Sequence, residues 1–401
     1  MADSHHSAVF PASEYYPDRG PAKYFHGRRK VLNDFSNLLQ YASNKSWGTT
    51  FLVQGALGVG KSALLYECGK HARAQEWQVV KVGVESLWKP YKLLDSLGLT
   101  DKYKLSERSM QFGLKNLFRR GYKSTRPEPT VESIPMDGQQ PLLLILDEAQ
   151  ALGDKDIPPS QHKATAIHVL EFIHNGELGR PIILLTAGLG GAKRGFGELK
   201  IPRFAANCFV ELGALDKGSE CAVIRDWIKK EGGAKGDPAA WIDAIAQETH
   251  GWPQHIQSYA NLAADQLKAY GRIMESDQLN AVLEAGRESR KEYYKERVDG
   301  FFGDEIQCLM NSIPDNPSGP PASRIDIMSS LTKKYGDREA KDLFDRFIRK
   351  GILEKSGAGL VVPIPSMHAW MKDEYSREKI EFPREQQISR GLHERSSGLE
   401  R

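Results

Sequence analysis

A glycine-rich loop lies between an apolar run and a helical segment in the first part of the chain. Residues 55–62 read GALGVGKS and match the spacing G-x-x-x-x-G-K-S. Glycines let a backbone fold around a phosphate so that N–H groups point inward, and a helix that begins directly afterwards favours an anion at its N-terminus. Lys61 can reach the β- and γ-phosphates of a nucleotide, and the Ser62 hydroxyl can bind Mg²⁺. The alternative is a glycine-rich turn that contains Lys-Ser by chance, and four fixed positions in the strand–helix context favour phosphate binding. The residues that we expect at the phosphates are Gly55, Ala56, Leu57, Gly58, Val59, Gly60, Lys61, Ser62 and Ala63.

Two acidic residues, Asp147 and Glu148, stand at the carboxyl end of the apolar run that begins at Leu142. This edge of an open α/β sheet is where ligands bind. An Asp there can hold Mg²⁺, and a Glu one residue later can orient an attacking water or accept its proton. A polar loop start after a buried strand explains the pair equally well on its own. Together with the phosphate loop, the pair favours water-directed phosphoryl chemistry over transfer to a bound acceptor.

The elements that must position these residues are five short apolar runs with helix-length segments between them. The strand candidates are residues 49–54, 77–82, 142–147, 181–186 and 208–213. Such runs, some bounded by Gly or Pro, predict a parallel sheet with crossover helices. We therefore expect an α/β core in which a five-stranded parallel sheet carries the phosphate loop and the acidic pair.

Composition and pattern divide the chain into five parts. We expect a polar arm at 1–22, the α/β core at 23–213, a helical segment at 214–299, a small domain at 300–376 and a charged tail at 377–401. The small domain has three helix-length segments and then GILEKSGAGLVVPIP, which predicts two short strands around a Gly turn. The boundary before it is soft, because the helix that ends near Arg297 fits either neighbour.

The overall composition excludes several classes of protein. The chain has 401 residues, 27% of them charged and 40% hydrophobic, which fits two or three globular domains. It contains no apolar run of about 18 residues, as a membrane-spanning helix needs, and its first residues lack the pattern of a secretory signal. The four cysteines have neither C-x-x-C nor His-paired spacing, which argues against a zinc site or a disulfide framework. We expect a cytoplasmic protein with no membrane partner.

With these motifs the chain resembles the AAA+ and STAND branch of P-loop ATPases, especially initiator-like members that carry a winged helix after a helical lid. The resemblance implies ATP and Mg²⁺ as cofactors, with Ser62 and Asp147 as metal ligands and Glu148 as the activator of water. Residues 24–39 resemble the family segment F-x-G-R-x-x-E-L, whose Gly-Arg lies beside the adenine and ribose. Arg28 matches that arginine, whereas a valine stands at the acidic position, and an amphipathic helix with basic surface residues is the alternative.

Two later residues match parts of the family that respond to the γ-phosphate. Thr186 resembles the sensor-1 position, although Thr also ends strands for structural reasons. Arg203 matches the arginine finger, which in rings acts on the nucleotide of a neighbouring subunit. Arg194 is the competing candidate, and an ordinary surface arginine is the alternative for both.

The lid contains both a match and a departure. The sequence HGWP at 250–253 resembles the Gly-x-Pro turn of STAND lids, where the proline (Pro253 here) packs near the base. Gln254 stands where many AAA+ proteins have an arginine sensor, and this departure favours switch-like STAND relatives over fast motors. His250 and His255 flank the turn, but two histidines without further ligands are typical of helix caps or cores rather than metal sites.

The distribution of charge indicates where a partner binds. The whole chain has a net charge of only +3, yet residues 102–126 hold eight basic residues and one acidic residue, with four aromatics among them. Such a segment can follow a phosphate backbone and stack bases, and an amphipathic helix with a solvated basic side fits it equally well. The helix expected at 337–350 has five basic and four acidic residues, which favours a solvated face or a protein contact over DNA.

Two functions follow from these patterns. In the first, a slowly hydrolysing ATPase switch forms a homo-oligomer in its ATP state and engages DNA through 102–126, or a DNA-bound partner. In the second, a signalling or defence scaffold ATPase recruits a protein effector through its C-terminal domain and does not bind DNA. The basic segment favours the first function. The near-neutral helix and the missing lid arginine favour the second.

Overall fold

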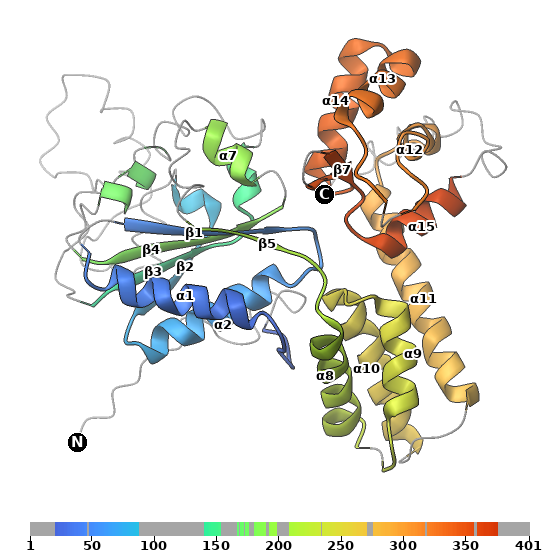
Figure 1. Ribbon diagram of the computed structural model, residues 1–401, viewed down its shortest axis with the longest axis horizontal. Coiled ribbons are helices and arrows are strands. Elements are labelled where there is room, and N and C mark those ends of the chain that lie inside the picture. Colours follow the sequence, from blue (N-terminus) through green and yellow to red (C-terminus); the bar gives the residue numbers. More distant parts are fainter. Residues whose placement is uncertain are drawn as a thin grey trace, which may run out of the picture. The chain divides into compact units, whose positions relative to one another are not determined.

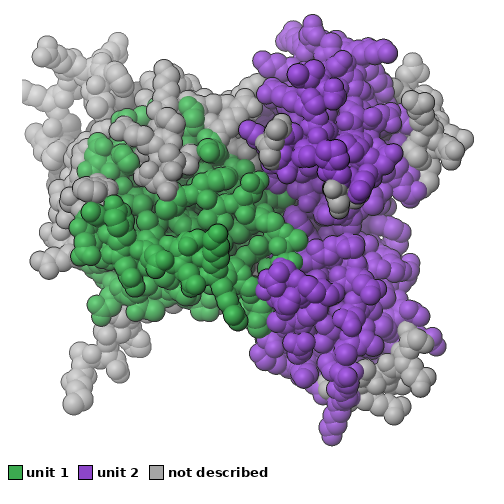
Figure 2. All heavy atoms as spheres, in the orientation of Figure 1, with its two compact units in different colours: residues 1–215 green, residues 216–401 purple. Residues whose placement is uncertain are grey.

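The computed structural model describes the protein as two compact units, residues 1–215 and 216–401 (Figure 2). The residues described are 21–45, 48–87, 140–153, 167, 169–171, 173–175, 180–189, 192–198, 208–233, 235–270, 276–316, 319–356 and 359–375. Most of the predicted arm, the basic segment 102–126, Arg203 and the tail 377–401 lie outside them. The finer domain boundaries expected within each unit stay predictions.

Unit 1 is built on a five-stranded parallel sheet, as the sequence predicts. The strands are β1 (Gly48–Gly55), β2 (Gln78–Val82), β3 (Leu142–Leu146), β4 (Ile182–Gly188) and β5 (Phe209–Leu212). Their order in the sheet is β2-β3-β4-β1-β5, and all four pairings are parallel. β1, β3 and β4 are buried along their whole length. Strands buried on both faces read as continuous apolar runs, which is why the sequence identifies them.

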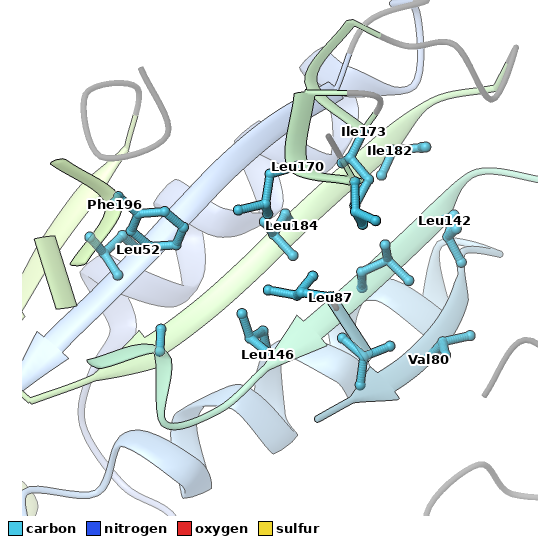
Figure 3. Close-up of a cluster of buried hydrophobic side chains, with 14 of the residues drawn as sticks. Leu52, Val80, Leu87, Leu142, Leu146, Leu170, Ile173, Ile182, Leu184 and Phe196 are labelled. Atoms are coloured by element: carbon cyan, nitrogen blue, oxygen red, sulfur yellow. The ribbon is translucent and has the colours of Figure 1, made fainter. Parts of the chain in front are cut away.

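Helices cover both faces of this sheet (Figure 1). On one face lie α1 (Arg29–Ala42) and α2 (Lys61–Ala74), and the Phe35 ring of α1 meets Phe51 of β1 edge-on, with centroids 5.5 Å apart. On the other face lie η1 (Val84–Leu87), η3 (Ala149–Gly153) and α7 (Ala192–Glu198). There Leu52, the next residue of β1, joins a cluster with Leu146 and Phe196 (Figure 3). Successive side chains of β1 thus fill two separate layers.

The first part of unit 2 is helical, as expected. Its elements are α8 (Lys217–Asp226), a π-helical turn η5 (Trp227–Glu231), α9 (Ala239–Thr249), α10 (Pro253–Tyr270) and α11 (Ser276–Val298). Asp216 caps α8 by accepting a 2.9 Å hydrogen bond from the Ser219 N–H. A Cβ added at Gly286 of α11 would lie 2.5 Å from the Tyr259 ring of α10, so glycine permits the close packing of these two helices.

The second part of unit 2 consists of helices and a short hairpin, and its assignment as a winged helix stays a prediction. Its helices are α12 (Gly303–Met310), α13 (Arg324–Tyr335), α14 (Asp337–Arg349) and α15 (Pro365–Glu374), and its strands are β6 (Glu354–Ser356) and β7 (Gly359–Val361). β6 and β7 form an antiparallel hairpin, and Ala322 forms a bridge with Leu360 of β7. The three helices before the hairpin and the hairpin itself were predicted, whereas α15 was not. Every helix among the described residues is too short or too polar to cross a bilayer.

Candidate phosphate-binding site

The glycine-rich loop connects the end of β1 to the start of α2, where its backbone requires glycine for two different reasons. Gly58 and Gly60 have φ values of 75° and 91°, in the left-handed region that strains residues with a Cβ. Gly55 has no room for a side chain, since a Cβ there would lie 2.8 Å from the carbonyl oxygen of Leu212 in β5. The predicted strand–loop–helix context of the motif is therefore present.

Lys61 is the first residue of α2, and its ammonium lies inside the loop. The side chain is buried, with 7% exposed, and Nζ donates hydrogen bonds of 2.9 Å to the carbonyl oxygens of both Gly55 and Ala56. A buried ammonium needs acceptors, and an anionic phosphate oxygen is a stronger acceptor than a neutral carbonyl. A phosphate that enters the loop can therefore replace the two carbonyl oxygens as the hydrogen-bond acceptor of the Lys61 ammonium.

The hydroxyl of Ser62 and the carboxylate of Asp147 meet at the edge of the sheet. Ser62 Oγ donates a 2.8 Å hydrogen bond to Asp147 Oδ2, across 85 positions of sequence. Oxygen ligands of this kind suit Mg²⁺, which usually takes few protein ligands and completes its shell with water and phosphates. Within the described ranges, no group of three or more His, Cys, Asp or Glu side chains is placed to hold a metal. The pair fits a magnesium ion bound together with a nucleotide.

Glu148 follows Asp147 and has an uncommon backbone conformation. Its φ is 59°, one of four positive values at described residues other than glycine, and such a conformation costs on the order of 1–3 kcal/mol. The Glu148 N–H donates to Asp147 Oδ1 at 3.0 Å, and the Ala151 N–H donates to the Glu148 carbonyl at 3.0 Å. Conformations of this kind persist where the surrounding structure holds them, often at functional sites.

Thr186 lies in the middle of the sheet, close to the acidic pair. β-Pairing aligns it with Leu52 of β1 on one side and Leu146 of β3 on the other, so it is level with the residue before Asp147. The side chain is fully buried, and its Oγ1 has no hydrogen-bond partner among the described residues. The predicted response of Thr186 to a γ-phosphate stays a prediction.

Arg28 contacts the phosphate loop directly. The residue has a φ of 60° and precedes α1. Its Nη2 donates to the carbonyl of Val59 in the loop at 3.3 Å and to the carbonyl of Gly213, just after β5, at 2.5 Å. The guanidinium therefore ties the loop to the end of the sheet. The predicted place of this residue beside the adenine and ribose stays a prediction.

The lid turn belongs to unit 2, where the structure gives its residues local roles. Pro253 begins α10, a position that favours proline because no N–H is needed there. His250 ends α9 in the left-handed region, with a φ of 49°, and His255 lies buried in α10. The cap-or-core interpretation of both histidines is confirmed. The place of Pro253 near a nucleotide base stays a prediction.

The two arginines predicted as candidate fingers have no described side chain. Arg203 lies outside the described residues, and Arg194 belongs to α7 but its side chain is not among those described.

One polar residue beside Glu148 was not predicted from the sequence. The Gln150 Nε2 donates to Glu148 Oε2, and the Gln150 Oε1 accepts from the Leu189 N–H at 3.0 Å. An amide two residues after the acidic pair was the available signal. Its partner after β4 becomes visible only when β3 and β4 are paired.

Comparison with known proteins supports the fold. No protein-family model matches the sequence, and no curated protein matches it either. Among solved structures, the ADP form of the Aeropyrum pernix ORC2 protein is similar over 91% of this chain and 97% of its own, with a TM-score of 0.58 and 14% identity. The same protein in ADPNP–ADP complexes gives a TM-score of 0.55 and 16% identity, over 91% and 98% of the two chains. A Walker-type ATPase of Pyrococcus abyssi gives 0.51 and 15%, over 88% and 99%. The chain therefore shares the fold of these solved ORC2 and Walker-type ATPase structures.

Proposed function

We propose that this protein is an ATP-binding and ATP-hydrolysing switch. The observation that carries the proposal is the 2.8 Å contact between Ser62 and Asp147, beside a loop with left-handed glycines and an enclosed lysine. It brings together, from two separate motifs, the two oxygen ligands that a nucleotide-bound Mg²⁺ needs. The solved ORC2 structure with ADPNP and ADP is a nucleotide complex of this same fold, which is consistent with the proposal.

Each residue of the site has one task in this proposal. The loop amides and Lys61 bind the phosphates, and Ser62 and Asp147 hold Mg²⁺, which when bound offsets the negative charge on the phosphate oxygens. Glu148 orients a water molecule and accepts its proton. The Thr186 hydroxyl, buried in the middle of the sheet, detects the γ-phosphate. ATP binding and its slow hydrolysis to ADP and phosphate switch the protein between two states.

The experiment that tests the proposal compares two lysines of α2. Lys61→Met keeps an apolar stem and removes the ammonium, so ATP affinity and phosphate release should each fall at least tenfold. Lys70→Ala is the control, because Lys70 is exposed and its ammonium contacts Glu67 and the Tyr66 ring of the same helix, away from the phosphate loop. It should behave as the parent in both assays. A folded Lys61→Met protein that binds ATP as tightly as the parent would contradict the assignment.

We further propose that ATP promotes assembly and that Arg203 of one subunit completes the site of the next. A planar guanidinium, charged at every physiological pH, suits the charge that develops on a transferred phosphoryl group. The mass of the particle in solution should increase with ATP. Arg203→Ala should lower turnover without preventing ATP binding, whereas Arg194→Ala should not. The reverse result would assign the finger to Arg194.

We also propose that the switch acts on DNA, which it binds through residues 102–126, or on a DNA-bound partner. The affinity for duplex DNA should fall steeply with salt: the logarithm of the binding constant should decrease with the logarithm of the salt concentration, with a slope of about 0.9 for each phosphate contacted. Neutralising Arg119, Arg120 and Lys123 should abolish it. Absence of binding at low salt would favour the second candidate, recruitment of a protein effector. That candidate is supported by α14, whose exposed side chains carry both signs of charge: Arg338, Glu339, Lys341 and Asp342.

A further inference from the structure

We propose that Gln150 is a positioning residue that orients the Glu148 carboxylate and links it to the end of β4. The proposal rests on the proposed function, because it requires Glu148 to act on water. Gln150 lies in η3, directly after β3, and is half-buried. It belongs to none of the motifs from which the nucleotide site was predicted.

The side-chain amide of Gln150 makes one hydrogen bond in each direction. Its Nε2 donates to Glu148 Oε2, and its Oε1 accepts from the backbone N–H of Leu189 at 3.0 Å. A backbone N–H can only donate and an ionised carboxylate can only accept. The amide therefore satisfies both neighbours in a single orientation. Neither a carboxylate nor a hydrocarbon at position 150 can do the same.

The surroundings leave little space for another arrangement. A Cβ added at Gly188, the last residue of β4, would lie 2.8 Å from Gln150 Oε1 and 2.6 Å from the Cβ of Ala192. Only glycine lets the end of β4 approach the amide this closely. The backbone of Glu148 is held as well, since its carbonyl accepts from the Ala151 N–H at 3.0 Å. Both the main chain and the carboxylate of Glu148 are thus oriented before any substrate arrives.

The same amide connects two predicted parts of the catalytic machinery. Leu189 follows β4, the strand that carries the buried Thr186. Glu148 follows β3, which pairs with β4 in parallel. A displacement of the end of β4 is therefore transmitted to the Glu148 carboxylate through Gln150. This link gives the predicted γ-phosphate sensor a direct route to the group that activates water.

The test uses two substitutions at position 150 in the full-length protein. Gln150→Glu keeps an acceptor for the Leu189 N–H but places a second negative charge against Glu148 and removes the donor. Gln150→Leu removes both hydrogen bonds. We expect kcat for ATP hydrolysis to fall at least tenfold in each, while the Kd for ATP changes less than twofold. The control is Gln140→Leu, since Gln140 lies before the other end of β3 and donates to the Glu76 carbonyl at 2.6 Å. It should keep the parent kcat.

Each outcome decides the proposal. Parent-like kcat in Gln150→Glu would show that the residue only fastens η3 to β4, and would overturn it. Equal losses of kcat and ATP affinity would indicate general disruption of the site and would overturn it too. If Gln150→Leu does not fold, Gln150→Glu decides alone. A parent protein without ATP turnover would overturn the proposed function itself. Turnover that Glu148→Gln abolishes and Gln150→Glu preserves would overturn only the role of Gln150.

Discussion

Buried charged groups have different partners in the two units of this molecule. In unit 1, Lys61 bonds to carbonyls of its own loop, and the half-buried Asp147 accepts from a serine hydroxyl. In unit 2, the buried carboxylate of Glu220 accepts from Thr249 Oγ1 at 2.5 Å and from the Gly251 N–H at 2.6 Å, which fastens the lid turn to α8. A ligand can replace the partners in unit 1, whereas those in unit 2 hold helices together.

A second cluster in unit 2 follows the same pattern. Glu248 of α9 accepts from Arg287 Nε at 3.0 Å, and Arg290 Nη1 donates to the Glu248 carbonyl at 2.7 Å. Burial raises the pKa of the Glu248 carboxyl, but the bonds and charges of Arg287 and Arg290 outweigh it and hold the pKa below the ordinary value. These contacts join α9 to α11. Substitutions at the phosphate-binding site of unit 1 should therefore change nucleotide handling, and substitutions at these buried clusters of unit 2 should change stability.

The largest effect should come from Glu148→Gln in unit 1. Loss of a general base lowers turnover by about 10²–10⁴-fold. ATP affinity should stay near the parent value, because the proposed mechanism gives Glu148 no contact with the phosphates or the metal. The melting temperature should also be unchanged. Phosphate release and calorimetry check these expectations, with Glu67→Gln on α2 as the control. Turnover that survives in Glu148→Gln would remove the residue from the mechanism.

The next largest effect should come from Glu220→Ala in unit 2. The change removes the carboxylate that accepts from the Gly251 N–H, whereas Thr249 Oγ1 can still donate to the Ile245 carbonyl at 3.0 Å. A buried N–H that loses its acceptor costs about 1–3 kcal/mol, so we expect the free energy of unfolding to fall by that amount. Urea denaturation measures it. Glu284→Ala, at a carboxylate that is 67% exposed, should change the free energy by less than about 0.5 kcal/mol. Equal effects of the two substitutions would contradict the comparison.

A smaller, pH-dependent effect should come from His255 in unit 2. Burial, with help from the charges of Arg290 and His250, lowers the pKa of His255 to about 3. The unfolded chain binds a proton near pH 6.5, so this contribution to stability is complete above that pH and is lost as pH falls toward 3. The expected loss is about 1.4 kcal/mol per pH unit, or about 2 kcal/mol between pH 6.5 and 5. His255→Gln should flatten the pH dependence of urea denaturation, and an unchanged slope would contradict the assignment.

The parts of the molecule that the sequence could predict are those whose requirements are local. The loop at 55–62 contains its own glycines, lysine and serine, and the flanking strand and helix have strong patterns. The strands β1, β3 and β4 were visible because burial on both faces makes their runs largely apolar, as in β1, where Phe51 and Leu52 fill opposite layers. Local pattern and tertiary burial agree at these positions, so the inference succeeded.

The parts that could not be predicted depend on contacts between distant segments. The role of Gln150 depends on its hydrogen bond with Leu189, which is 39 positions away in the sequence and is brought near by the pairing of β3 with β4. The contact of Arg28 with Gly213 spans 185 positions and likewise needs the finished sheet. α15 was not predicted, although Pro365 in its first turn is a typical helix start.

The central claim is that Ser62 and Asp147 form the magnesium side of an ATP site. Calorimetric titration with ATP, in Mg²⁺ and again with the metal removed by a chelator, tests it most directly. For the parent we predict that removing Mg²⁺ weakens ATP binding at least tenfold, since the metal offsets the phosphate charge beside Asp147. For Asp147→Asn we predict weak binding that Mg²⁺ does not change. The same Mg²⁺ dependence in Asp147→Asn as in the parent would contradict the claim.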